Sequence, residues 1–183
     1  MTYSVASKRA MKRAASTLTV IFAMTAGTAL AQAVTDQDKA FLKDTEQDSN
    51  YEIKTGQLAL QKSKSADIRA YATMLIHDHT GLKLQTLAVD QAAKVKPESA
   101  GSMSVSDDAE YLKLKLLTGD TFDESYIKTL VKGNQEAVDK TKAEASNSSI
   151  PAVKKLAQHR SELDTKHTEK AKQLAQAHKV STN

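Results

Sequence analysis

The chain has 183 residues, of which 40% are hydrophobic, and this suits one domain of ordinary size or two small ones. Its six glycines and two prolines are too few for the many turns of an all-β protein, so a mostly helical fold is favoured. Because there is no cysteine, disulfide scaffolds, thiolate metal sites and cysteine nucleophiles are excluded. Beyond the N-terminus no uncharged stretch of about 20 residues exists, which excludes a protein with several transmembrane helices.

The first 31 residues have the pattern of a secretory signal peptide. An apolar run over residues 14–29 ends in small residues and follows a basic segment, which consists of Lys8, Arg9, Lys12 and Arg13. We expect cleavage after Ala31, with Ala33 as the second choice, and hence a periplasmic or otherwise exported protein without a transmembrane domain. The alternative is a retained membrane anchor, for which the apolar run is short compared with the usual span of about 20 residues.

Removal of this segment changes the charge of the protein. The full chain carries 26 basic and 22 acidic residues and a formal net charge of +4. All four charges of the predicted signal peptide are basic, so 22 charges of each sign remain in the mature chain. Lysines alternate with acidic residues along every segment, which is typical of solvated helix faces and leaves no one-signed surface. We therefore expect no nucleic-acid partner.

From residue 36 onward the sequence predicts helices almost to its end. The first runs over residues 36–63 with Thr35 or Asp36 as its cap, and the second runs over residues 65–95. A flexible linker over residues 98–106 then separates the two halves of the chain.

The second half of the chain contains a short helix and two further long ones. The short helix covers residues 107–118, and a third long helix covers residues 122–145 with Thr121 as its cap. The stretch 147–151 ends that helix and starts the fourth, for which Ser149 is the expected cap and which continues to about residue 178.

The expected fold class is all-α, an antiparallel four-helix bundle of up-down-up-down topology or with one longer crossover. The long connection lies between the second and third long helices and contains the extra short helix. The expected organisation is a signal peptide over residues 1–31, the bundle over residues 36–178 and a tail over residues 179–183.

Polar residues stand on the apolar stripe that each long helix should turn toward the core. The stripes recur at three- and four-residue steps, and their polar members include Glu52, His79, Asn134 and His167. At a rise of about 1.5 Å per residue, these positions and Asp164 lie at similar distances from the interhelical turns. The sequence therefore predicts a convergent polar layer in the middle of the bundle.

Two interpretations of this layer stay open. In the first, its members only satisfy one another, because a buried polar group without a partner costs about 1–3 kcal/mol. A Glu52–His79 hydrogen bond would then fix the register of two helices. In the second, the layer binds a metal ion. Outside it, His77 points away from the stripe, and His159 and His178 have no helical partner at ligand spacing, so all three are expected at the surface.

Two glycines lie inside the predicted helices near this layer. Gly56 and Gly133 each cost about 1 kcal/mol relative to alanine in a helix interior. Either the helices tolerate this cost, or they approach each other closely beside the layer.

Two short motifs on these helices carry a family likeness. The first is Met-x-x-x-Asp-His, which ends at Asp78-His79, and the second is Gly-x-x-Phe-Asp-x-x-Tyr over residues 119–126. Together with the helix around His167, they resemble the bacterial family called domain of unknown function 4142 (DUF4142). The likeness spans about residues 38–177, nearly all of the predicted mature chain.

The resemblance implies a ferritin-like bundle in the periplasm or on the cell envelope, in a family without a settled biochemical activity. It directs attention to four positions, Glu52, Asp78, His79 and His167. This chain departs from the family in one respect. The family typically has a second Asp-His pair on the third long helix, where this sequence has Gly133 and Asn134.

The residue pattern argues separately against a di-iron centre. Such a centre takes a Glu from each of two helices and a Glu-x-x-His pair from each of the other two. Here Asp164-x-x-His167 is a shortened version, no acid stands three residues before His79, and the third long helix offers only Asn134. Glu52, His79, Asp164 and His167 would suffice for a single iron, zinc, manganese or copper ion. We expect no oxidase or ferroxidase chemistry of the di-iron type.

The leading expectation is a non-enzymatic exported bundle of the cell envelope, which acts in stress protection, by binding an envelope partner or by self-association. This interpretation requires no cofactor. The alternative is a ferritin-like metalloprotein with one metal ion or a weak redox site in the polar layer. A sensor or adhesion module is less favoured, because the sequence has neither a second membrane segment nor an output domain.

Overall fold

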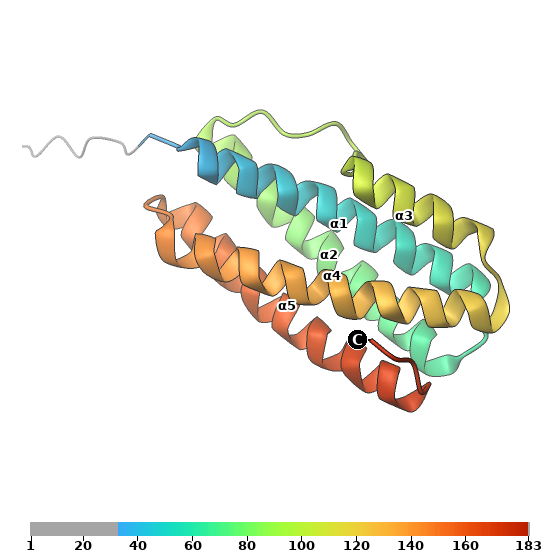
Figure 1. Cartoon of the computed structure of the whole chain (residues 1–183). Helices are drawn as coiled ribbons and strands as arrows, with labels where there is room; N and C mark the ends of the chain where they lie inside the picture. The colour runs from blue at the N-terminus through green and yellow to red at the C-terminus, as the bar shows by residue number, and fades with distance from the viewer. Residues whose placement is uncertain (1–32, 183) are drawn as a thin grey trace, which may run out of the picture. The chain divides into compact units, whose positions relative to one another are not determined.

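The structure, a computed structural model, describes residues 33–182. The predicted signal peptide lies outside these residues and stays a prediction. Between residues 33 and 182 there are five helices and no strand, which confirms the all-α class. The helices are α1 (Asp36–Lys62), α2 (Ala66–Ala93), α3 (Val105–Leu116), α4 (Gly119–Asn147) and α5 (Pro151–Ala177) (Figure 1). None of them is long and apolar enough to cross a membrane.

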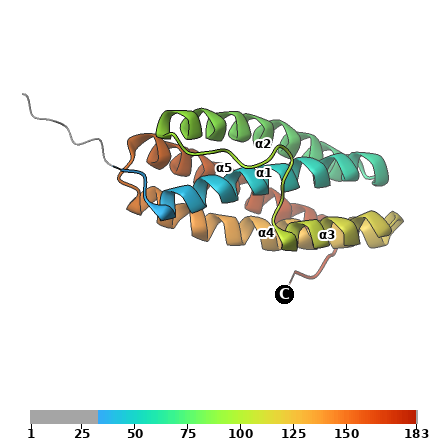
Figure 2. The same ribbon diagram turned by 90° about the horizontal axis from the view of Figure 1, so that it is seen from above.

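The four long helices pack side by side as two hairpins. The helix α1 packs against α2, and α4 packs against α5; the hairpins then meet where α2 contacts α5 and α1 contacts α4. The connection between the hairpins runs back along the assembly before α3, which packs on α1 and α4 (Figures 1 and 2). As a result α4 runs in the same direction as α2, and α5 in the same direction as α1 (Figure 1).

Helix boundaries follow local capping chemistry. Thr35 forms the predicted cap of α1, because its hydroxyl accepts the backbone N–H of Asp38 at 3.1 Å while the Asp38 carboxylate accepts the N–H of Thr35 at 2.8 Å. The predicted start of α4 was wrong: the helix begins at Gly119, whose φ of 57° suits glycine, after Thr118 rather than Thr121.

The start of α5 also differs from the prediction. Its N-cap is Ile150, not Ser149, and its first residue is Pro151. The hydroxyl of Ser148 accepts the backbone N–H of Ile150 at 3.2 Å and donates to Asp38 at 2.6 Å. Ser148 therefore connects the α4–α5 turn to the start of α1. The short helix α3 starts at residue 105, two residues earlier than predicted, because Ser104 caps it.

A belt of buried polar side chains separates two apolar clusters in the core. One cluster is at the α1–α2 turn end and includes Leu75, Phe122, Tyr126 and Leu174. The other includes Phe41, Leu42, Leu82, Val153 and Leu156. Along α2, His79 stands between Leu75 and Leu82, and along α5 four buried polar residues stand between Leu156 and Ala171. The polar belt is therefore set by the sequence of each helix and lies where the four helices face one another.

Candidate functional site

The residues of the predicted layer are buried. Glu52, His79, Asn134, Asp164 and His167 each expose 5% of their surface or less, and they come from all four long helices. Burial of five hydrogen-bonding groups requires partners, since a buried polar atom that lacks one is costly. The partners divide the five residues into separate groups.

The first group is a histidine pair formed by His79 on α2 and His167 on α5. Their ring centroids lie 5.3 Å apart. The Nε2 atom of His167 is 3.0 Å from a carboxylate oxygen of Asp78. The hydroxyl of Tyr71 donates to the backbone carbonyl of His167 at 3.0 Å, and this contact ties α2 to α5 beside the rings.

Burial, together with the neighbouring charges, sets the protonation of the histidine pair. Burial raises the pKa of Asp78, but hydrogen bonds from His167, His77 and Lys166 outweigh it and bring the pKa to about 2. Burial lowers the pKa of His79 well below its ordinary value, and His167 lowers it further. Burial likewise lowers the pKa of His167, although Asp78 opposes this shift. Both imidazoles are therefore neutral at pH 7.

The proton positions leave free lone pairs on the rings. An ionised Asp78 only accepts hydrogen bonds, so Nε2 of His167 carries the proton and Nδ1 has the lone pair. That Nδ1 atom is buried without a hydrogen-bond partner, and both ring nitrogens of His79 are too. The pair thus offers buried imidazole nitrogens that make no hydrogen bond to residues 33–182.

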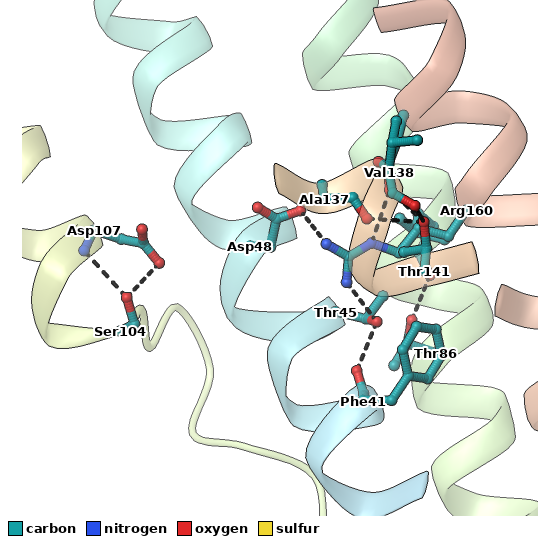
Figure 3. A network of polar contacts seen from close by, with 12 residues as sticks. Phe41, Thr45, Asp48, Thr86, Ser104, Asp107, Ala137, Val138, Thr141 and Arg160 are labelled. Carbon is teal, nitrogen blue, oxygen red and sulfur yellow. Dashed lines mark hydrogen bonds and ion pairs between the residues drawn. The ribbon is translucent and has the colours of Figure 1, made fainter. Parts of the chain in front are cut away.

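The second group surrounds Arg160 of α5, and we call it the Arg160 cluster (Figure 3). The guanidinium donates to the hydroxyl of Thr45 at 2.7 Å and to the carboxylate of Asp48 at 2.8 Å, both on α1. Its Nε lies 3.5 Å from a carboxylate oxygen of Asp164, one turn further along α5. Thr141 of α4 donates to the same oxygen at 3.3 Å. The cluster therefore joins α1, α4 and α5.

Carboxylates outnumber cations in the Arg160 cluster. Burial raises the pKa of Asp164 to about 7, even though Arg160 favours the ionised form. Burial also raises the pKa of Glu52 well above its ordinary value, and the charges of Asp48 and Asp164 add to this shift. One carboxylate oxygen of Glu52 is buried without a hydrogen-bond partner.

The predicted layer is thus divided rather than continuous. Among residues 33–182 no hydrogen bond or ion pair joins Glu52 or Asp164 to either imidazole. Asn134 donates to the carbonyl of Leu130 in its own helix at 2.8 Å and approaches the hydroxyl of Tyr71 at 3.5 Å. Within the described part of the chain, no three acidic or histidine side chains converge in a metal-binding arrangement.

Arg160 is the residue of this region that sequence reasoning did not treat as functional. It lies on the apolar stripe of α5 and is 4% exposed. A cation on a core stripe, four residues before an acid, was the available signal, since an arginine is almost never buried without an anionic partner.

These features define a class of protein: an all-helical domain whose core holds a neutral histidine pair and an arginine–carboxylate cluster. The family described as Domain of unknown function (DUF4142) matches residues 23–174. The chain belongs to this family, as the sequence motifs predicted. No curated protein matches the chain significantly in sequence.

Two solved structures are similar to this fold. One is described as the crystal structure of a DUF305 fragment from Deinococcus radiodurans, with a TM-score of 0.69 and 16% identity over 79% of this chain and 99% of that one. The other is described as CopM in the Cu(I)-bound form, with a TM-score of 0.64 and 20% identity over 76% of this chain and 96% of that one. At such identities the likeness concerns the fold.

Proposed function

We propose that this protein is an exported, non-enzymatic, ferritin-like four-helix bundle that binds a single copper(I) ion between His79 and His167. The observation that carries the proposal is the histidine pair, in which three ring nitrogens are buried without a hydrogen-bond partner. Because a neutral imidazole has one N–H and one lone pair, two of these nitrogens, one on each ring, can donate to a metal ion, and neutral imidazole is among the commonest metal ligands in proteins.

The surroundings of His167 support a ligand role. Metal-binding histidines almost always donate their second ring N–H to a carboxylate or carbonyl, which fixes the tautomer and the ring orientation. The contact between Nε2 of His167 and Asp78, at 3.0 Å, has this form and leaves Nδ1 as the coordinating atom. When bound, the ion would be held by the two imidazoles, with Asp78 as the orienting group.

The number of donors favours copper(I) over the other metals considered. Structural zinc takes four ligands, and a di-iron centre takes carboxylates from several helices. The histidine pair has no carboxylate besides Asp78, whose oxygens accept from His167, His77 and Lys166. Copper(I) is stable with only a pair of nitrogen ligands, and imidazole suits copper. The Cu(I)-bound state described for CopM, a protein of similar fold, agrees with this choice.

The ferritin-like arrangement is part of the same proposal. In ferritin-like bundles one long crossover connects two helical hairpins. Here the connection with α3 joins the α1–α2 and α4–α5 hairpins, and α4 runs in the same direction as α2 (Figure 1).

To test the copper proposal, the protein is purified without chelator or metal-affinity tag. It is then titrated with Cu(I) under anaerobic reducing conditions. Bicinchoninate is the competing chelator, and elemental analysis gives the stoichiometry. We expect one equivalent of copper in the wild type and its loss in His79→Gln and in His167→Gln. His159→Gln is the matched control, because this α5 histidine contacts Gln85 at the surface.

Two outcomes would overturn the proposal: a wild type that takes up no copper, or both core variants binding it as the wild type does. Should a glutamine variant unfold, Asp78→Asn keeps both imidazoles and removes only the anionic acceptor. We expect this variant to bind copper about 10- to 100-fold more weakly. Unchanged affinity would show that Asp78 plays no part in the site.

Export rests on the sequence of residues 1–31 and has its own test. Expression in a Gram-negative host, followed by intact-mass analysis of the periplasmic fraction, should give a chain that starts at Gln32. A chain that starts at Val34 would correspond to the second cleavage choice. Recovery of the uncleaved chain in the membrane fraction would instead support the retained anchor.

A further inference from the structure

A cavity of about 280 Å³ lies beside the Arg160 cluster, between α1, the start of α3 and α4. No histidine lines it, so it is distinct from the proposed copper site. Its walls include Asp48 and Arg160 on one side and Ser104 and Asp107 on the other; Figure 3 shows Asp48 between Arg160 and the Ser104–Asp107 pair.

Acidic side chains outnumber basic ones in the lining of the cavity. Five carboxylates line it against two cations; the carboxylates are Asp44, Asp48, Glu52, Asp107 and Glu136, and the cations are Lys140 and Arg160. Arg160 already pairs with Asp48 at 2.8 Å and with Asp164 behind the wall at 3.5 Å. Arg160 is therefore already paired, and a bound cation would favour the ionised form of Glu52, whose pKa burial raises.

Two buried polar groups on the wall have no hydrogen-bond partner among residues 33–182. Glu52 is 5% exposed and its Oε2 atom makes no hydrogen bond; Tyr51 is 7% exposed and its hydroxyl makes none. Each such group destabilises the folded protein when it stays unsatisfied. A ligand with N–H donors would satisfy both, so these two residues mark the inner end of the site.

The carboxylates are spread over three helices instead of converging on one point. Asp44, Asp48 and Glu52 are on α1, Asp107 is on α3 and Glu136 is on α4. No three of the acidic side chains in residues 33–182 are arranged to hold a metal ion. An elongated organic cation reaches separate walls, whereas a bare ion does not. The volume is just below the usual range of about 300–1,000 Å³ for drug-sized ligands, so the cation is small.

We propose that this cavity binds a linear aliphatic diamine. One ammonium group pairs with Glu52 at the inner wall, and the other pairs with Asp107 on α3. The methylene chain between them contacts the rings of Phe41 and Tyr51, which also line the cavity. Aromatic faces of this kind attract alkylammonium groups as well as methylenes.

Isothermal titration calorimetry at pH 7 with 1,4-diaminobutane tests the proposal. The uncharged analogue 1,4-butanediol and magnesium chloride serve as comparison ligands. We expect the diamine to bind, the diol not to bind, and the Glu52→Gln variant to lose affinity by about thirtyfold or more, as for a buried charge pair that loses one partner. Asp107→Asn, nearer the surface, should lose affinity several-fold.

Matched controls separate the cavity from general charge effects. Glu124→Gln removes an exposed carboxylate of α4 that pairs with Lys128, and it should leave diamine binding unchanged. His79→Gln should also leave it unchanged, because the copper site is separate. The proposal is overturned if the wild type binds diol and diamine equally, if magnesium binds more tightly than the diamine, or if both Glu52→Gln and Asp107→Asn retain wild-type affinity.

Discussion

Besides Glu52 and Asp164, the buried acids of the core include Asp90 of α2 and Glu46 of α1. They lie at the end of the bundle where the linker leaves α2. Asp90 is fully buried, Glu46 is 3% exposed, and neither oxygen of Asp90 has a hydrogen-bond partner. Burial raises the pKa of Asp90 to about 7, and the neighbouring Glu46 carboxyl contributes to this shift. Asp90 lies four residues beyond Thr86 on the apolar stripe of α2, so the sequence contained a signal for its burial.

The raised pKa of Asp90 predicts that the protein loses stability as the pH rises. Unfolded, this carboxyl titrates near 3.8, so between about pH 4 and 7 the folded state keeps a proton that the unfolded state has lost. The free energy of unfolding therefore falls across this window and stays low above pH 7. Asp164, with a pKa of about 7, adds in the same direction.

The variant Asp90→Asn isolates this contribution, because asparagine resembles the protonated acid at every pH. We expect it to be more stable than the wild type at pH 8, with a difference that shrinks toward pH 4. Urea denaturation at several pH values measures this difference. Asp139→Asn, an exposed position on α4, is the control and should show no such trend. A difference for Asp90→Asn that is the same at pH 4 and pH 8 would contradict the prediction.

At the scale of the helices, the two interior glycines have opposite roles. A Cβ atom on Gly56 would lie 2.9 Å from Cγ1 of Ile76 and 3.2 Å from the backbone oxygen of Ala72. This is the close approach of α1 and α2 that the sequence allowed for. At Gly133 of α4 a Cβ atom would have no neighbour within 4 Å, so there the glycine reflects no close approach.

The two glycines therefore predict opposite effects of alanine. Gly133→Ala should stabilise the protein by about 1 kcal/mol, the helix-propensity difference. Gly56→Ala gains the same propensity but has to displace a backbone oxygen, and overpacking of this kind costs about 1–3 kcal/mol. We expect a net loss of up to about 2 kcal/mol. Thermal and urea unfolding of the two variants provide the comparison; a Gly56→Ala protein as stable as Gly133→Ala would contradict it.

The sequence predicted the positions of the helices and of their buried residues, but it did not predict all helix caps or which side chains meet in the core. Apolar periodicity located the helices to within about three residues and identified the buried polar positions on each stripe, because burial repeats with the helical turn. Capping at Thr118 and Ile150 was missed, since several neighbouring Ser and Thr residues compete for each cap. Counting residues from the interhelical turn placed Glu52 and His79 at the same height in the bundle. The direction in which each side chain points relative to the other helices, however, depends on how the helices pack.

Because the sequence does not give these directions, one polar layer was expected where the structure has two groups. Asp164 pairs with Arg160, and Glu52 lines the cavity beside Arg160, while His79 and His167 meet where α2 contacts α5. Heights come from the sequence, since the rise per residue is constant. Which side chains meet at a given height depends on how the two hairpins pair, and no single helix contains that information.

The division into two groups has a thermodynamic consequence for the whole molecule. Substitutions at sites without shared partners are additive within about 0.3–0.5 kcal/mol, whereas contacting residues couple by about 0.5–3 kcal/mol. In a double-mutant cycle, we expect Glu52→Gln and His79→Gln to be additive in the free energy of unfolding. Arg160→Met and Asp164→Asn, whose side chains lie 3.5 Å apart, should couple and serve as the positive control. Coupling of Glu52 and His79 beyond about 0.5 kcal/mol would mean that the core functions as the single polar layer that the sequence predicted. The affinities for copper and for the diamine would then depend on each other, because the two ligands would not occupy independent sites.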